Sequence, residues 1–165
     1  MIRLYLRSRF NWKHYGVVFV ICTLLLTVPG CDKDRIREAA KASDRIATLI
    51  GSAIDLKREL GPSGATCKTL NRCITAAEEL ALTQQLLTAN TRVKQFNDYA
   101  RTIKEDTPTS RLDLAEAFSK VTSAVNALSN QAIFPIKDPE AKKRLLAILN
   151  SINAAILIID SSLKG

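Results

Sequence analysis

LTQQLLTANTRVKQFNDYARTI, residues 82–103, decides the fold class of this chain. Its apolar residues recur in alternating steps of four and three, which is the heptad spacing of a helix that packs one face against other helices. The members of this stripe are Leu82, Leu86, Ala89, Val93, Phe96, Ala100 and Ile103. The segment therefore predicts a long helix, which we expect to run from about residue 68 to residue 105.

A first helix is expected on the N-terminal side, from about residue 33 to residue 60. It ends at GPSG, residues 61–64, where a glycine follows the last apolar position as in a helix C-cap. On the C-terminal side, Ser110 followed by Asp113 resembles a capping box and predicts the start of a third helix. Its stripe has the same spacing and consists of Leu114, Phe118, Val121, Val125, Leu128 and Ala132.

The third helix is broken at FPIK, residues 134–137, because proline cannot continue a helix. Asp138 is the expected N-cap of a fourth helix, and Pro139 suits its first helical position. The fourth stripe consists of Leu145, Leu149, Ile152, Ile156, Ile159 and Leu163.

Four helices joined by short turns predict an all-α fold, an antiparallel up-down-up-down four-helix bundle. No segment of the sequence after residue 31 has the pattern of a strand. The 135 residues from 31 to 165 can bury about two-thirds of their unfolded surface, so we expect one domain with its own core.

A leader precedes this domain. Its first residues carry four positive charges and no negative one, at Arg3, Arg7, Arg9 and Lys13. An uncharged run of 13 residues follows, residues 16–28. A membrane-crossing helix needs ~20 residues, whereas the apolar core of a secretion signal has only ~7–15. We therefore interpret residues 1–30 as a cleaved signal peptide and residues 31–165 as the helical bundle domain.

The end of the leader, Val28-Pro29-Gly30-Cys31, resembles the lipobox of bacterial lipoproteins. The resemblance implies that Cys31 carries a lipid such as palmitate and becomes the first mature residue. The protein would then be anchored to a membrane of the cell envelope, on its periplasmic or outer face. Asp32 resembles the residue that retains such proteins at the inner membrane in enterobacterial-type sorting. Two alternatives stay open: an ordinary signal peptide cleaved before Cys31, and an uncleaved anchor, which the short apolar run disfavours.

Composition limits the chemistry of the mature part. Without the leader, 20 bases face 16 acids, so half of the +8 net charge of the chain belongs to the leader and does not predict nucleic-acid binding. No histidine remains after residue 30, which excludes catalysis by a histidine base and the ligand sets of di-iron bundles. We therefore predict no enzyme activity, no cofactor and no metal site.

Cys67 and Cys73 are the remaining cysteines, and an oxidising compartment favours their pairing. Six residues apart on one helix, their Cα atoms would be ~9 Å apart, beyond the ~7 Å limit of a disulfide. A bridge therefore requires Cys67 to lie in the turn before the helix. The alternative is a pair of buried thiols.

Two charged motifs are interpreted as solvated surface. Glu78 and Glu79 are neighbours that point ~100° apart on a helix, so they do not form a catalytic pair of carboxylates. Lys142-Lys143-Arg144 is a basic triplet at the start of the fourth helix. Its functional alternative is contact with anionic lipid or with a cell-wall polymer.

Leu157 and Ile158 fall on the outer face of the fourth helix in its heptad register. Either the long second helix encloses them, or they meet a protein partner or a second copy of the chain. Our preferred function is a membrane-anchored, non-enzymatic bundle that acts through protein or envelope contacts. The alternative is a carrier of a small hydrophobic ligand, with Phe96, Phe118 and Phe134 lining an apolar cavity inside the bundle.

Overall fold

The computed structural model describes residues 31–70, 73–105 and 107–164, with the backbone alone for residues 31–33 and 70. The predicted signal peptide, residues 1–30, lies outside the described residues. From Asp32 onward the chain forms one compact unit. Within the described residues every regular element is helical and no strand occurs, so the prediction of an all-α fold is confirmed.

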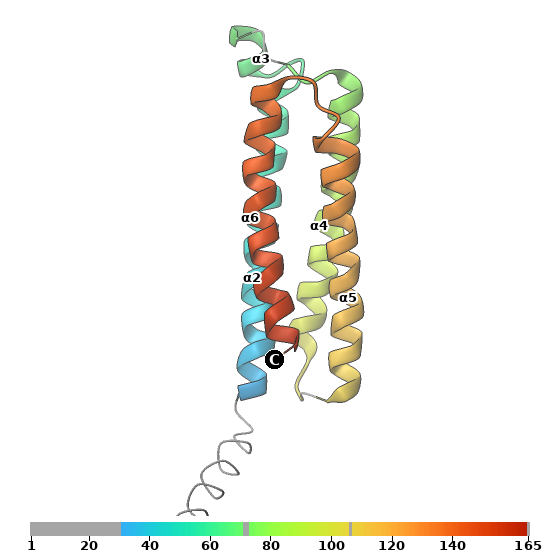
Figure 1. Cartoon of the computed structure of the whole chain (residues 1–165). Coiled ribbons are helices and arrows are strands. Elements are labelled where there is room, and N and C mark those ends of the chain that lie inside the picture. Colours follow the sequence, from blue (N-terminus) through green and yellow to red (C-terminus); the bar gives the residue numbers. More distant parts are fainter. Residues whose placement is uncertain (1–30, 71–72, 106, 165) are drawn as a thin grey trace, which may run out of the picture. The chain divides into compact units, whose positions relative to one another are not determined.

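Four of the helices are long, and Figure 1 shows them side by side. A short helix, α3, lies at the end where α2 finishes, and a π-helical turn, η1, continues α5. The elements are α2 (Cys31–Leu60), α3 (Ala65–Leu70), α4 (Ala76–Thr102), α5 (Pro108–Ala127), η1 (Leu128–Ile133) and α6 (Pro139–Lys164).

The apolar stripes form the core. From Leu82 to Ala100 every member of the predicted α4 stripe is buried, and Ile103 is half-buried. The stripe of α5 is buried throughout, and in α6 only Ile156 and Leu163 are partly exposed. Heptad spacing therefore identified the core residues of three helices correctly, because burial follows the helical period.

Polar contacts join α2 to α4. Asp44, early in α2, accepts hydrogen bonds from Asn97 and Arg101, late in α4. Lys57, late in α2, donates to the hydroxyl of Thr83, early in α4, at 3.0 Å. These contacts determine which ends of the two helices lie together.

The second helix begins later than the sequence pattern predicts, at Ala76 instead of residue 68. Thr75 is its N-cap: the Thr75 hydroxyl accepts from the Glu78 N–H at 3.2 Å, and the Thr75 N–H donates to the Glu78 carboxylate at 2.7 Å. This capping box supplies partners for backbone groups that would otherwise lack them at the helix start. The preceding residues form α3 and an extended segment instead.

The third helix begins earlier than predicted, and Ser110 is not its N-cap. Thr107 caps α5, Pro108 takes the first helical position, and Ser110 closes a capping box at the third. The fixed backbone angle of proline suits that first position, which places the start of the helix ahead of Ser110. The predicted start of α6 is confirmed, because Asp138 accepts from the N–H of Ala141 at 2.7 Å.

η1 ends the third helix at the predicted break. The N–H of Phe134 donates to the carbonyl of Ser129 at 2.9 Å, a bond that spans five residues instead of four. Such wide turns accommodate one additional residue inside a continuous helix. Pro135 follows directly, and the chain then turns into α6.

Candidate functional site

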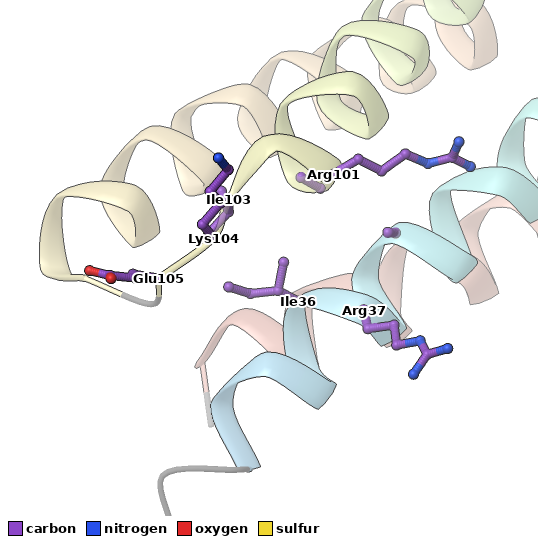
Figure 2. A pocket seen from close by; sticks show the side chains of 8 residues that line it. Ile36, Arg37, Arg101, Ile103, Lys104 and Glu105 are labelled. Atoms are coloured by element: carbon purple, nitrogen blue, oxygen red, sulfur yellow. The ribbon is translucent and has the colours of Figure 1, made fainter.

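A hollow with a volume of about 210 Å³ opens between the beginning of α2 and the end of α4. We call this hollow the end notch, and Figure 2 shows it from close by. It brings together residues that are more than sixty positions apart in the sequence. Its lining residues are Ile36, Arg37, Ala40, Ala100, Arg101, Ile103, Lys104 and Glu105.

The end notch has an apolar floor and a charged rim. Ala100 is buried, and Ile36 and Ile103 are half-buried and pack against the core. Figure 2 shows the Ile36 side chain pointing toward the segment that holds Ile103 and Lys104, while Arg37 extends away from it. The charged side chains are exposed, so the hollow combines an apolar surface with accessible bases.

The basic side chains of the rim differ in whether a carboxylate balances their positive charge. Arg101 Nη2 lies 3.0 Å from each carboxylate oxygen of Asp44, so the charge of Arg101 is largely balanced. Arg37 and Lys104 make no hydrogen bond or ion pair with any residue that the structure describes. Their two positive charges are therefore available to an external anion, with Glu105 as the acid of the rim.

A second hollow, with a volume of about 530 Å³, lies in the groove between α2 and α6. Arg144 and Glu59 face each other across it, with Nη2 and Oε2 3.3 Å apart. The Thr66 hydroxyl also donates to Glu59. These contacts, first the hydrogen bond from Thr66 and then that from Arg144, lower the pKa of the Glu59 carboxyl. One member of the basic triplet is thus a structural partner of α2.

Leu157 and Ile158 are exposed, with 68% and 40% of their surfaces accessible. The alternative in which the second long helix encloses them is wrong, because no helix of the described bundle covers these side chains. Ile158 also lines a hollow of about 230 Å³ beside Lys41, Ala42 and Arg45 of α2.

α6 is long and apolar enough to cross a membrane by length and composition, among the residues that the structure describes. Six of its residues are nevertheless buried in the core of the bundle, at Ala141, Leu145, Leu149, Ile152, Ala155 and Ile159. A core helix of this kind passes the same test of length and composition. The exposed pair at Leu157 and Ile158 lies in this otherwise well-packed helix.

Cys67 and Cys73 form a disulfide in the structure, with their Cα atoms 4.6 Å apart. Cys67 lies in α3, and Cys73 lies in the extended segment before α4. The two cysteines are therefore not on one helix, which removes the distance conflict expected from a continuous helix. Cys31 opens α2, and its side chain lies outside the described residues.

Glu78 and Glu79 have structural partners. Glu78 closes the capping box and accepts from the N–H of Lys137 at 3.0 Å. Burial by itself raises the pKa of Glu78, but the backbone hydrogen bonds from Thr75 and Lys137 outweigh it and leave the pKa below its usual value. Glu79 lies 3.8 Å from Lys57. Among the described residues no group of three or more His, Cys, Asp or Glu side chains could hold a metal ion.

Phe96 and Phe118 pack against each other, with ring centres 6.0 Å apart. Phe96 is completely buried and Phe118 nearly so, whereas 52% of the surface of Phe134 is accessible. None of the three lines any of the hollows described above.

Comparison of the chain with protein-family models, with curated proteins and with solved structures finds no match in any of the three. The function must therefore be argued from the sequence and the structure themselves.

The end notch has no counterpart in the sequence pattern. Ile36, Ala100 and Ile103 carry the helical period, but nothing along the chain indicates that they meet. Arg37 and Lys104 resemble any other exposed base until α2 and α4 are placed together.

Proposed function

We propose that this chain is a bacterial lipoprotein whose Cys31 lipid anchors a non-enzymatic helical bundle to a membrane of the cell envelope. The bundle acts through contact with another protein or with a second copy of itself. The observation that carries the contact function is the exposed apolar pair, Leu157 and Ile158, on a helix otherwise built into the core.

We further infer that the four long helices form an antiparallel, up-down-up-down bundle. Asp44 in the first half of α2 pairs with Arg101 at the end of α4, whereas Lys57 near the end of α2 contacts Thr83 early in α4. The Tyr99 hydroxyl donates to Asp113 at 3.1 Å, which joins the end of α4 to the start of α5. Arg144 at the start of α6 meets Glu59 at the end of α2. Each of these pairs is what opposite helix directions require.

Two features support the lipid anchor. The leader has the charge and length of an export signal and is followed directly by a cysteine. The compact unit begins at Asp32, the residue immediately after that cysteine. A cut before Cys31 would therefore remove the leader and leave the core of the bundle complete.

The anchor is tested by growing the producing cells with radioactive palmitate. We expect the wild-type chain and Cys22→Ser to carry the label and to fractionate with membranes. Cys31→Ser should lose the label and show a mass without the acyl groups. An unlabelled wild-type chain in the soluble fraction, or label retained by Cys31→Ser, would overturn the proposal.

The contact surface is tested with Leu157→Lys combined with Ile158→Lys. Burying two lysine side chains in an interface costs much free energy, because their charges lose water. We therefore expect the variant to form no crosslinked complexes in cells, while its circular dichroism spectrum stays that of the wild type. The matched control is Leu80→Lys with Leu87→Lys on α4, where 61% and 56% of the leucine surfaces are accessible. Equal loss of complexes in both double variants would contradict the assignment to α6.

The carrier alternative requires an apolar cavity between the helices. The direct packing of Phe96 on Phe118 fills the space where these rings would have to line it. Non-enzymatic contact is therefore the better supported of the two functions.

A further inference from the structure

We propose that the end notch binds the headgroup of an anionic phospholipid in the membrane that holds the Cys31 anchor. This inference rests on the proposed anchor and adds a second, non-covalent contact between the bundle and the bilayer.

The covalent tether keeps the end notch close to the membrane. Ile36 is five residues after Cys31. Five residues span at most ~18 Å when fully extended, and only ~8 Å when helical. The headgroup layer on each side of a bilayer is about 5–8 Å thick. Residues 31–36 form the first turns of α2, so the shorter span applies, and a lipid attached at Cys31 holds the notch at or just above the layer of lipid headgroups.

The charges of the end notch suit a singly charged anion. With Asp44 included, three bases face two acids, which leaves one net positive charge. Arg37 of α2 and Lys104, after the end of α4, both line the hollow, and neither has a partner among the residues that the structure describes. A phosphodiester headgroup carries one negative charge and accepts hydrogen bonds from both kinds of side chain.

The apolar floor suits the part of a lipid that joins the headgroup to its chains. Ile36 and Ile103 are half-buried, so they offer partly accessible apolar surface beside the bases. The volume of about 210 Å³ is smaller than the ~300 Å³ at which pockets begin to enclose a drug-sized ligand. The notch can hold a headgroup and the first carbons of a chain, while the remainder of the lipid stays in the bilayer.

The test uses the full chain as isolated from bacterial membranes and reconstituted into phosphatidylcholine vesicles. The vesicles contain a trace of a photoactivatable phosphatidylglycerol or of a phosphatidylcholine that carries the same photoactivatable chain. Mass spectrometry of peptides then locates the crosslinks. We expect the anionic probe to label peptides containing residues 36–40 or 100–105 several-fold more than the neutral probe.

The variant combines Arg37→Glu with Lys104→Glu. One base at an anionic membrane surface strengthens association about fivefold, so reversing both charges should reduce labelling by the anionic probe to that of the neutral probe. The matched control combines Lys68→Glu with Lys94→Glu, which changes the net charge equally at exposed positions outside the notch. The control should keep the labelling pattern, and both variants should keep the unfolding midpoint of the wild type.

The outcomes separate this inference from the proposed anchor, because the mass of the N-terminal peptide is measured in the same sample. A lipidated Cys31 with equal labelling by the two probes overturns the headgroup site alone. Crosslinks spread along the bundle, or a loss shared with the control variant, also overturn it. An unmodified Cys31 overturns both the anchor and the headgroup site.

Discussion

Gly64 and Gly51 should respond to the same substitution with opposite signs. A Cβ added at Gly64 would lie 1.9 Å from the carbonyl oxygen of Glu59 and 2.4 Å from its carbonyl carbon. Both are backbone atoms, so no side-chain rotation relieves the clash and the turn itself must move. A Cβ at Gly51, inside α2, would meet no heavy atom within 4 Å.

The space around each glycine sets how much the substitution should change the free energy of unfolding. Overpacking that forces a backbone shift costs about 1–3 kcal/mol, so Gly64→Ala should lower the free energy of unfolding by that amount. Gly51→Ala should raise it by about 0.5–1 kcal/mol, because alanine loses less backbone entropy in a helix. The two variants should therefore differ by roughly 1.5–4 kcal/mol although they carry the same chemical change.

The assay is urea unfolding of the purified, oxidised protein, followed by the helical circular dichroism signal. The slope of the free energy against urea should stay constant, so that the shift in midpoint reports stability alone. If Gly64→Ala is as stable as the wild type, the close approach of the turn to the end of α2 is wrong. If Gly51→Ala is destabilising, the open environment assigned to that position is wrong.

Three further perturbations test the core, the disulfide and the cap. Phe96→Ala should lower the free energy of unfolding by about 3–5 kcal/mol, because it leaves a cavity beside Phe118; a loss below about 1 kcal/mol in urea unfolding would contradict the packing. Reduction of the Cys67–Cys73 bridge should lower the free energy of unfolding by about 2 kcal/mol, as expected for so short a loop, and a variant with serine at both positions should not respond to the reductant. The depressed pKa of Glu78 stabilises the fold above the ordinary glutamate pKa of 4.5, and this contribution is lost as the pH falls through the lower folded-state pKa; Glu78→Gln should weaken the acid dependence of unfolding, and an unchanged dependence would refute the role of the cap.

Sequence periodicity predicted the core well and the helix starts less well. The stripe from Leu82 to Ala100 is buried as expected, because burial on a helix follows a fixed angular step. The start of α4 was placed eight residues too early, although Thr75 and Glu78 have the spacing of a capping box. Apolar spacing alone cannot distinguish one long helix from a short helix, an extended segment and a second helix.

The end notch could not be predicted, for a different reason. It depends on the height at which α2 packs against α4, which is set by contacts such as that of Asp44 with Arg101. These residues are 57 positions apart, and no local pattern encodes their meeting. The heptad register of α6 placed Leu157 and Ile158 on its outer face, but it could not show whether another helix covers them, and only the structure shows that both are exposed.

The wide turn η1 affects how the end of the third helix packs against both α4 and α6. One additional residue in a helical turn rotates all later residues by about 100° around the axis. Ala132 and Ile133 are consecutive and are both buried, and η1 contacts both α4 and α6. Deleting one residue from this turn would restore ordinary α-helical winding. Phe134 and Ile136 would then point in different directions around the helix axis. The connection to α6 would be misplaced even though no core side chain had been replaced.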